Sequence, residues 1–172
     1  MQIAVVYSSM TGNTALLAQV IAETVTNGEC VFLGTAERAL TLPQSIEEAE
    51  VIFVGFWTDK GSCDAQTASF LESLHGKQIF LFGTAGFGGD GSYFAQIMAR
   101  VQKHIADTNQ IVGSWMCQGK MPLSVRKKYE TMPEQKDGQR AVLLKNFDQA
   151  AQHPDAADLA ALQQMVNQII AN

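Results

Sequence analysis

Five short apolar runs recur along this 172-residue chain, and stretches with the spacing of amphipathic helices separate them. Hydrophobic residues are almost continuous within each run, as in strands that are buried on both faces of a sheet. Strands that alternate with helices in this way predict an α/β fold, a doubly wound parallel sheet with right-handed crossovers. The predicted strands are residues 3–7, 30–33, 51–56, 78–82 and 111–116.

Helix signals lie between these strands. Gly28 is suited to end the first helix in a left-handed conformation, Asp64 to begin the third, and Asp155 to cap the last. About 35 residues follow the fifth strand before that last helix, and an unstructured loop of such length is improbable in a compact domain. The predicted helices after the first are residues 43–49 (one or two turns), 64–75, 92–106, 123–132, 140–151 and the segment after 154.

Length and composition favour one domain over residues 1–172. No apolar run is long enough to cross a membrane, and the N-terminus lacks the basic region of a signal peptide. Three cysteines are too few and too scattered for a disulfide framework or a metal site. His75, His104 and His153 are expected at the surface, and the expected compartment is the cytoplasm.

Charge is distributed unevenly. Residues 1–117 carry 5 Lys and Arg against 11 Asp and Glu, whereas residues 118–145 carry 7 against 3. An acidic body argues against nucleic acid as a partner, and no membrane partner is expected. The basic stretch either meets an acidic partner or is an ordinary solvated surface, and the sequence leaves both interpretations open.

A hydroxyl-rich turn, residues 8–14, joins the first predicted strand to the first helix. Backbone N–H groups in the first turn of a helix lack intrahelical partners and attract anions. Ser9, Thr11 and Thr14 add side-chain donors, and Gly12 lets the backbone approach a ligand. No Lys or Arg precedes Arg38, so neutral donors alone would hold the anion, which suits a permanently bound phosphate monoester. The alternative is a turn that merely caps the helix.

The motif Ser9-x-Thr11-Gly12-Asn13-Thr14, in this position, resembles the FMN-phosphate loop of flavodoxins. The resemblance covers about residues 1–117 and 155–172. It implies a flavodoxin-like sheet with strand order 2-1-3-4-5, with FMN beyond the carboxyl ends of the strands near the switch point between strands 1 and 3.

The loop after the third strand, residues 55–62, contains Trp57 at the position where flavodoxins place their inner flavin-stacking aromatic residue. Stacking on a flavin ring would contribute about 0.5–1.5 kcal/mol beyond the buried area. The alternative is an ordinary packing residue at the edge of the sheet.

Five glycines lie among residues 83–91, after the fourth strand, and would let backbone groups reach the pyrimidine edge of a flavin. Either Phe87 or Tyr93 would cover the other face of the ring, and the sequence does not decide between them. Residues 86–91 also match G-x-G-x-x-G, but a dinucleotide fingerprint belongs after the first strand.

No catalytic residue and no metal ligand is predicted. The predicted FMN-binding residues are Ser8, Ser9, Met10, Thr11, Gly12, Asn13, Thr14, Phe56, Trp57, Thr58, Asp59, Lys60, Gly61, Thr84, Ala85, Gly86, Phe87, Gly88, Asp90 and Tyr93.

Residues 118–153 form an extended basic insertion that a minimal flavodoxin does not need. With the Gly-Phe-Trp-x-Asp-Lys-Gly run at residues 55–61 and Gln152-His153-Pro154, it is similar to a subgroup of flavodoxin-like proteins. Some members of that subgroup assist reductases such as bilin reductases.

The absence of a Walker A lysine in residues 8–14 argues against phosphoryl transfer, and no acid–base pair is visible. The chemistry would therefore belong to the cofactor. The sequence predicts a flavoprotein that shuttles single electrons between an NAD(P)H-dependent reductase and a partner redox enzyme. One alternative is an FMN-dependent NAD(P)H or quinone oxidoreductase of the same fold, and another is an interaction module that has lost its flavin.

Overall fold

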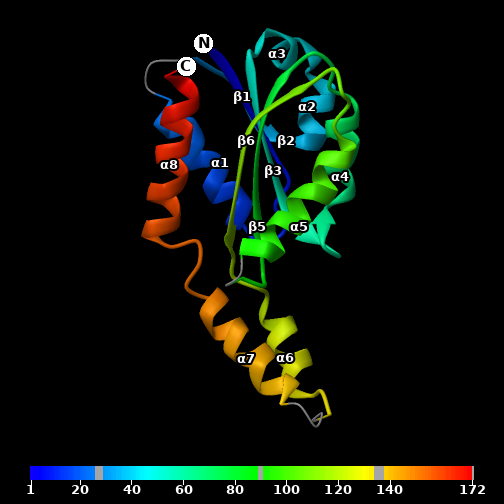
Figure 1. The fold of residues 1–172 in the computed structure, drawn as a ribbon, viewed down its shortest axis with the longest axis vertical. Coiled ribbons are helices and arrows are strands. Elements are labelled where there is room, and N and C mark those ends of the chain that lie inside the picture. The colour runs from blue at the N-terminus through cyan, green and yellow to red at the C-terminus, as the bar shows by residue number, and fades with distance from the viewer. Residues whose placement is uncertain (26–28, 89–90, 134–137, 172) are drawn as a thin grey trace.

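The computed structural model describes residues 1–25, 29–88, 91–133 and 138–171. A twisted parallel sheet runs through the molecule with helices on both faces (Figure 1). Its strands are β1 (Gln2–Tyr7), β2 (Glu29–Thr35), β3 (Val51–Asp59), β5 (Gln78–Ala85) and β6 (Gln110–Gln118), with the short β4 (Ser62–Cys63) beside β3. The order β2-β1-β3-β5-β6 confirms the predicted 2-1-3-4-5 arrangement, since β4 pairs only with β3 and is antiparallel to it.

Two helical layers cover the sheet. Helices α1 (Asn13–Thr24) and α8 (Ala156–Ile170) lie on one face. The other face is covered by α2 (Ala36–Thr41), α3 (Pro43–Glu48), α4 (Ala65–Glu72), α5 (Gly91–Val101) and the 3₁₀ turn η1 (Gln102–His104). Among the described helices, none combines the length and apolar character that crossing a bilayer requires.

Strand residues alternate between the two layers because successive side chains point to opposite faces of a sheet. Ile3 and Phe53 pack toward α1 and α8, whereas Ala4 and Ile52 pack toward α2–α5. All four are fully buried. Burial on both faces explains why the strands read as continuous apolar runs.

Several boundaries differ from the sequence-based expectation. Helix α2 was not predicted; it is capped by the Thr35 side chain, which accepts a hydrogen bond from Arg38 N at 3.3 Å. Strand β3 continues through residues 57–59, predicted as loop, because Trp57 pairs with Thr84 of β5 and Thr58 pairs with Cys63 of β4. Helices α4 and α5 end earlier than predicted, and the expected Gly28 cap lies outside the described residues.

Helices α6 (Leu123–Glu130) and α7 (Gln139–Ala150) lie side by side and project beyond the carboxyl edge of the sheet (Figure 1). They confirm the two predicted short helices in the insertion. The chain then returns to α8, which begins at the predicted cap: Asp155 Oδ1 accepts hydrogen bonds from Ala157 N and Asp158 N, each at 2.9 Å. The insertion thus folds as a helical hairpin above the edge where ligands bind in α/β sheets.

Candidate functional site

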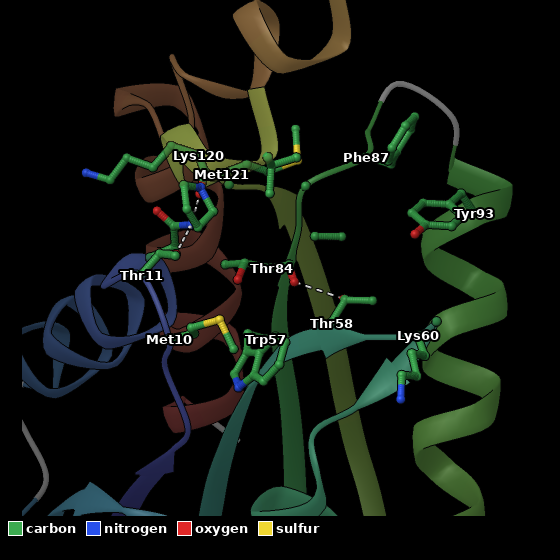
Figure 2. A pocket seen from close by; sticks show the side chains of 17 residues that line it. Met10, Thr11, Trp57, Thr58, Lys60, Thr84, Phe87, Tyr93, Lys120 and Met121 are labelled. Atoms are coloured by element: carbon green, nitrogen blue, oxygen red, sulfur yellow. Dashed lines mark hydrogen bonds between the residues drawn. The ribbon is translucent and has the colours of Figure 1, made fainter. Parts of the chain in front are cut away.

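A pocket of about 370 Å³ opens at the carboxyl edge of the sheet, between the segments that follow β1, β3, β5 and β6 (Figure 2). Its size lies within the range of about 300–1,000 Å³ that is usual for small-molecule sites. The predicted site residues that line it are Met10, Thr11, Asn13, Trp57, Thr58, Lys60, Gly61, Thr84, Ala85, Gly86, Phe87 and Tyr93.

The other predicted site residues do not line the pocket. Phe56 packs its ring into the core, where a Cβ placed on Gly83 would lie 2.6 Å from Phe56 Cζ. Asp90 lies outside the described residues. The remaining six predicted residues are also absent from the pocket wall: Ser8, Ser9, Gly12, Thr14, Asp59 and Gly88.

The start of α1 is built for a ligand rather than for a side-chain cap. Gly12 precedes the helix in the left-handed region, with φ 88°, and has no side chain to bind the first-turn N–H groups. Ser9 Oγ and Asn13 Oδ1 are buried and have no hydrogen-bond partner in the described part of the chain. Buried polar atoms are almost always paired, so these two indicate a missing ligand.

Asn13 itself is firmly oriented. Its Nδ2 donates to Thr11 Oγ1 at 3.0 Å and to Lys120 O at 2.9 Å, which leaves Oδ1 as the free acceptor. Ser9 contributes a hydroxyl that can donate to a phosphate oxygen, whereas Asn13 Oδ1 can accept from a ligand hydroxyl. The two atoms therefore suit a ligand that carries both an anion and hydroxyl groups.

Thr14 plays a different part from the one expected. Its side chain is fully buried, and its hydroxyl donates to Phe56 O at 3.3 Å and lies 3.1 Å from Thr84 Oγ1. Thr58 Oγ1 donates to Thr84 O at 2.9 Å. These bonds join the start of α1 to β3 and β5, so Thr14 fixes the turn before α1 in place and its hydroxyl is already engaged.

A tight hairpin carries Lys60. Lys60 and Gly61 have φ values of 48° and 81°, as both central residues of a type I′ turn require, and they join β3 to β4. Arg100 Nη1 donates to Gly61 O at 3.0 Å and ties the turn to α5. The Asp-Lys-Gly sequence was a usable turn signal, because glycine favours the second central position.

Three aromatic side chains lie on the pocket wall (Figure 2). Trp57 is half-buried at the end of β3, and Phe87 is 37% exposed on the segment after β5. Tyr93 stands on α5, where it packs partly against the core and its ring centroid lies 6.2 Å from that of Phe94. Phe87 and Tyr93, the two residues predicted as alternatives for the second face of the flavin ring, therefore both reach the pocket.

The segment after β6 completes the pocket, and sequence analysis missed its contribution. Gly119, Lys120, Met121, Pro122 and Val125 all line the pocket wall. The rule that ligands bind beyond the carboxyl ends of parallel strands indicates this segment, but none of its residues was among those predicted for the site. It brings a second cation to the pocket wall besides the predicted Lys60, although Figure 2 shows the Lys120 ammonium on the outer side of the pocket.

Helix α7 also reaches the site. Gly86 O accepts hydrogen bonds from Asn146 Nδ2 at 3.0 Å and from Gln118 Nε2 at 3.1 Å, and Gln118 Nε2 lies 3.0 Å from Asn146 Oδ1. Gln118 and Asn146 are both buried. The insertion is thus bonded to the glycine-rich segment that lines the pocket.

The cysteines offer no reactive thiolate. Burial raises the pKa of Cys63 to about 11, helped by the neighbouring carboxylate of Asp64. Burial is also the largest cause that raises the pKa of Cys117. Both thiols stay protonated at neutral pH, so the position of Cys63 just before α4 does not make it a reactive thiolate.

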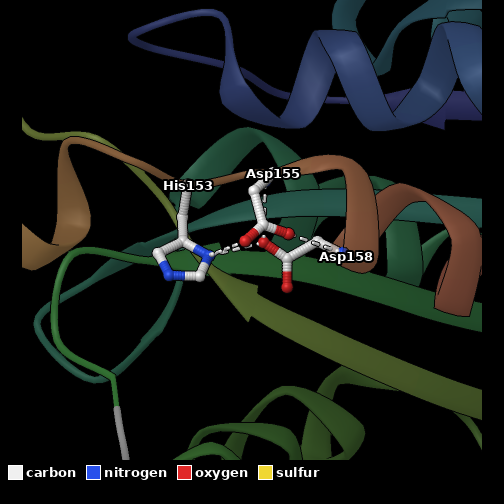
Figure 3. Close-up of side chains that lie close together, drawn as sticks. All are labelled: His153, Asp155 and Asp158. Carbon is white, nitrogen blue, oxygen red and sulfur yellow. Dashed lines mark hydrogen bonds and ion pairs between the residues drawn. The ribbon is translucent and has the colours of Figure 1, made fainter.

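His153, Asp155 and Asp158 lie close together at the start of α8 (Figure 3). His153 Nδ1 lies 2.6 Å from Asp158 Oδ2, which also accepts a hydrogen bond from Asp155 N at 2.9 Å. Backbone N–H donation, first from Asp158, lowers the pKa of Asp155. The capping of α8 therefore accounts for the two carboxylates, and His153 pairs with one of them.

Comparison with known proteins identifies the same fold. Residues 4–167 match the model of the flavodoxin domain family. The chain is 38% identical over 177 residues to the flavodoxin-like domain-containing protein BilS of Clostridium symbiosum, covering 95% of this chain and 93% of that protein. It is 32% identical over 157 residues to the protein of the same name from Clostridioides difficile, covering 90% and 88%.

Solved structures agree in fold. A putative flavoprotein from Bacteroides eggerthii superposes with a TM-score of 0.52 at 17% identity, covering 78% of this chain and 99% of that one. A flavodoxin from Streptococcus pneumoniae superposes with a TM-score of 0.50 at 14% identity, covering 87% of this chain and 97% of that one. At such low identity these similarities concern the arrangement of strands and helices only.

Proposed function

This chain belongs to the flavodoxin family, and we propose that it binds FMN in the carboxyl-edge pocket and carries single electrons between redox proteins. The donor would be an NAD(P)H-dependent reductase. Because some members of the flavodoxin-like subgroup that it resembles assist bilin reductases, such a reductase is the first acceptor to test.

The observation that carries this proposal is the pair of unpartnered polar atoms at the start of α1, Ser9 Oγ and Asn13 Oδ1. FMN offers a phosphate for the donor and ribityl hydroxyls for the acceptor. The uncapped first turn of α1 would add backbone N–H groups and the positive end of the helix dipole.

The rest of the pocket suits the flavin ring. Trp57 provides an aromatic face on one wall, and Phe87 or Tyr93 provides one on the other. Gly86 brings backbone into the wall without a side chain; a Cβ there would lie 2.6 Å from Met121 Cγ. FMN supplies the redox chemistry when bound, and the protein supplies binding, orientation and electrostatics.

The composition of the pocket wall favours a carrier over a self-contained enzyme. Of the described residues that line the pocket, none is Asp, Glu, His or Cys. The ionisable side chains on the wall are those of Lys60, Tyr93 and Lys120, so the wall offers no carboxylate, imidazole or thiol to move protons to or from a substrate. The exposed Met10 and Phe87 at the rim leave the pocket open to a partner.

Flavin titration of the apo-protein tests this function. FMN at 100 times its dissociation constant is expected to raise the free energy of unfolding by about 2.7 kcal/mol. Riboflavin, which lacks the phosphate, is expected to bind more weakly. Ser9→Ala should weaken the binding of FMN and leave the affinity for riboflavin unchanged. Ser69→Ala, on the exposed side of α4, is the matched control.

Two outcomes contradict the proposal at different levels. If saturating FMN changes neither the melting temperature nor the flavin fluorescence, the carrier and the FMN-dependent oxidoreductase are both excluded. If NADPH alone bleaches the flavin of the purified protein, without an added reductase, the oxidoreductase is the correct assignment.

A further inference from the structure

We propose that the α6–α7 hairpin, defined as the helices Leu123–Glu130 and Gln139–Ala150, forms together with Lys120 the docking surface for an acidic redox partner. The proposal rests on the electron-carrier function and adds to it the chemistry of the partner. It also decides between the two interpretations of the basic stretch that the sequence left open.

The charge of this surface is opposite to that of the body. Residues 118–145 carry a net charge of +4 in a chain whose total is −5. Lys120, Lys127, Lys128 and Lys145 are all exposed, and no described carboxylate forms an ion pair with any of them. Cations without intramolecular partners are available to a carboxylate on another molecule.

Exposed apolar side chains accompany these lysines. Among the described large hydrophobic residues, the three most exposed are Leu123 (70%), Met10 (64%) and Val142 (61%). Two of them belong to the hairpin, and Met10 lines the pocket. Leu123 and Lys127 lie one turn apart on the same face of α6. Exposed apolar side chains beside charged ones are typical of protein interfaces, whereas a merely solvated helix does not need them.

The hairpin is fixed against the pocket. Val125 of α6 lines the pocket, and Asn146 of α7 donates to Gly86 O at 3.0 Å. Phe147 is buried beneath Arg126, whose guanidinium carbon lies 5.5 Å from the ring centroid and which also pairs with Glu130 and Asp148. A partner seated on the hairpin would therefore lie at the pocket mouth, where the distance for electron transfer is short.

The occupant is a protein rather than a nucleic acid. The acidic body, with a net charge of −6 over residues 1–117, would repel a long polyanion that extends past the hairpin. A protein with acidic side chains around its own redox centre presents a local patch that matches the hairpin. An anionic membrane surface is the competing class and is an outcome of the test.

A matched pair of acceptors measures the preference directly: native cytochrome c, which is basic, and succinylated cytochrome c, which is acidic. The FMN-loaded protein is reduced with dithionite, desalted and mixed with each form in a stopped-flow instrument. In each productive encounter the reduced flavin loses one electron, the ferric haem gains it and becomes ferrous, and no atom is exchanged.

We expect the succinylated form to be reduced on the order of tenfold faster at low ionic strength, with the preference lost as salt is added. The double substitution Lys127→Glu and Lys128→Glu should make native cytochrome c the faster acceptor. Each single substitution should reduce the preference for the succinylated form. Lys103→Glu, an exposed lysine at the opposite end of the molecule in η1, is the matched control and should change little.

Three results would overturn the proposal. The first is faster reduction of native cytochrome c, which would show that the net charge of −5 governs encounter. The second is an effect of Lys127→Glu and Lys128→Glu on the reduction rates that is no larger than the effect of Lys103→Glu. Salt-sensitive binding to phosphatidylserine vesicles, abolished by the same reversals without any effect on haem reduction, would assign the hairpin to membranes. In all three cases FMN still binds and reduces haem, whereas failure of the proposed function would leave a protein that retains no FMN.

Discussion

The two ends of the sheet carry hollows of similar size but of different character. The carboxyl-edge pocket measures about 370 Å³, and a hollow at the amino edge, between α2, α3 and α4, measures about 330 Å³. In the amino-edge hollow, Lys77 Nζ donates to Glu47 O at 2.7 Å and to Ala49 O at 3.2 Å, and Ser73 Oγ donates to Phe70 O at 2.7 Å.

At the carboxyl edge, by contrast, the turn before α1 holds Ser9 Oγ and Asn13 Oδ1, the two buried side-chain polar atoms that lack partners in the described structure. Parallel strands followed by helices direct helix N-termini, with their free N–H groups, to the carboxyl edge. Volume alone therefore does not mark the ligand site. Unpaired polar atoms at the start of a helix do, and each variant pair below tests that distinction.

The largest effect is expected from a pair of bridging asparagines. Asn146 binds Gly86 O and Gln118 at the pocket, and Asn109 at the amino edge donates to Leu74 O at 2.7 Å and accepts from Lys77 N at 2.9 Å. Replacing either with Leu should lower the free energy of unfolding by about 1–3 kcal/mol in chemical denaturation. Only Asn146→Leu should also raise the dissociation constant of FMN, and equal FMN affinity in the two variants would show that α7 does not position the pocket.

Two glycines with positive φ form the second pair. Gly12 (φ 88°) and Gly76 (φ 66°) both have open space where a Cβ would lie. Alanine at either position should cost about 1–2 kcal/mol of stability because the left-handed conformation disfavours a side chain. Only Gly12→Ala should raise the dissociation constant of FMN, on the order of tenfold in fluorescence titration. A comparable loss of FMN affinity in Gly76→Ala would mean that general destabilisation is responsible.

Exposed apolar residues in the two hollows form the third pair. Phe87→Ala should weaken the free energy of FMN binding by about 0.5–1.5 kcal/mol, the contribution of an aromatic stacking partner. Leu40→Ala, at a residue 51% exposed in the amino-edge hollow, should leave the FMN dissociation constant unchanged. A greater loss in Tyr93→Ala than in Phe87→Ala would assign the outer face of the flavin to Tyr93.

The smallest effect concerns the flavin potential. Lys60 lies at the tip of the β3–β4 hairpin and lines the pocket, where its charge would favour the more negative, fully reduced flavin. Two unit charges 4 Å apart at an effective dielectric of 20 interact with roughly 4 kcal/mol. A quarter of that interaction energy corresponds to a shift of about 40 mV in a one-electron midpoint. Lys60→Ala should therefore make the second one-electron midpoint more negative by at most about 40 mV in spectroelectrochemistry. An unchanged midpoint, as expected for Lys103→Ala, would place the Lys60 charge in solvent.

Much of the fold followed from local signals. Continuous apolar runs located the five long strands, Asp64 and Asp155 marked the starts of α4 and α8, and the hydroxyl-rich turn fell at the start of α1 as predicted. The β4 hairpin and α2 were missed. Strand β4 has only two residues, and α2 only six, so neither produces a hydrophobic period long enough to recognise.

The individual roles of site residues were harder to predict. Thr14 and Ser9 are both hydroxyl residues in the same turn, yet the hydroxyl of Thr14 is engaged by Phe56 and Thr84 while that of Ser9 has no partner. Which hydroxyl faces inward depends on how α1 packs against β3 and β5. Residue type and spacing carry no such information.

The sequence by itself determined the alternation of strands and helices, the position of the turn beside the first helix, and the reversal of charge after residue 117. Each of these is a property of neighbouring residues. Only the tertiary structure brought Lys120 to Asn13, 107 residues away, and Asn146 to Gly86, 60 residues away. Contacts at such separations depend on the order and register of the strands, so the basic hairpin became part of the pocket only when the sheet was assembled.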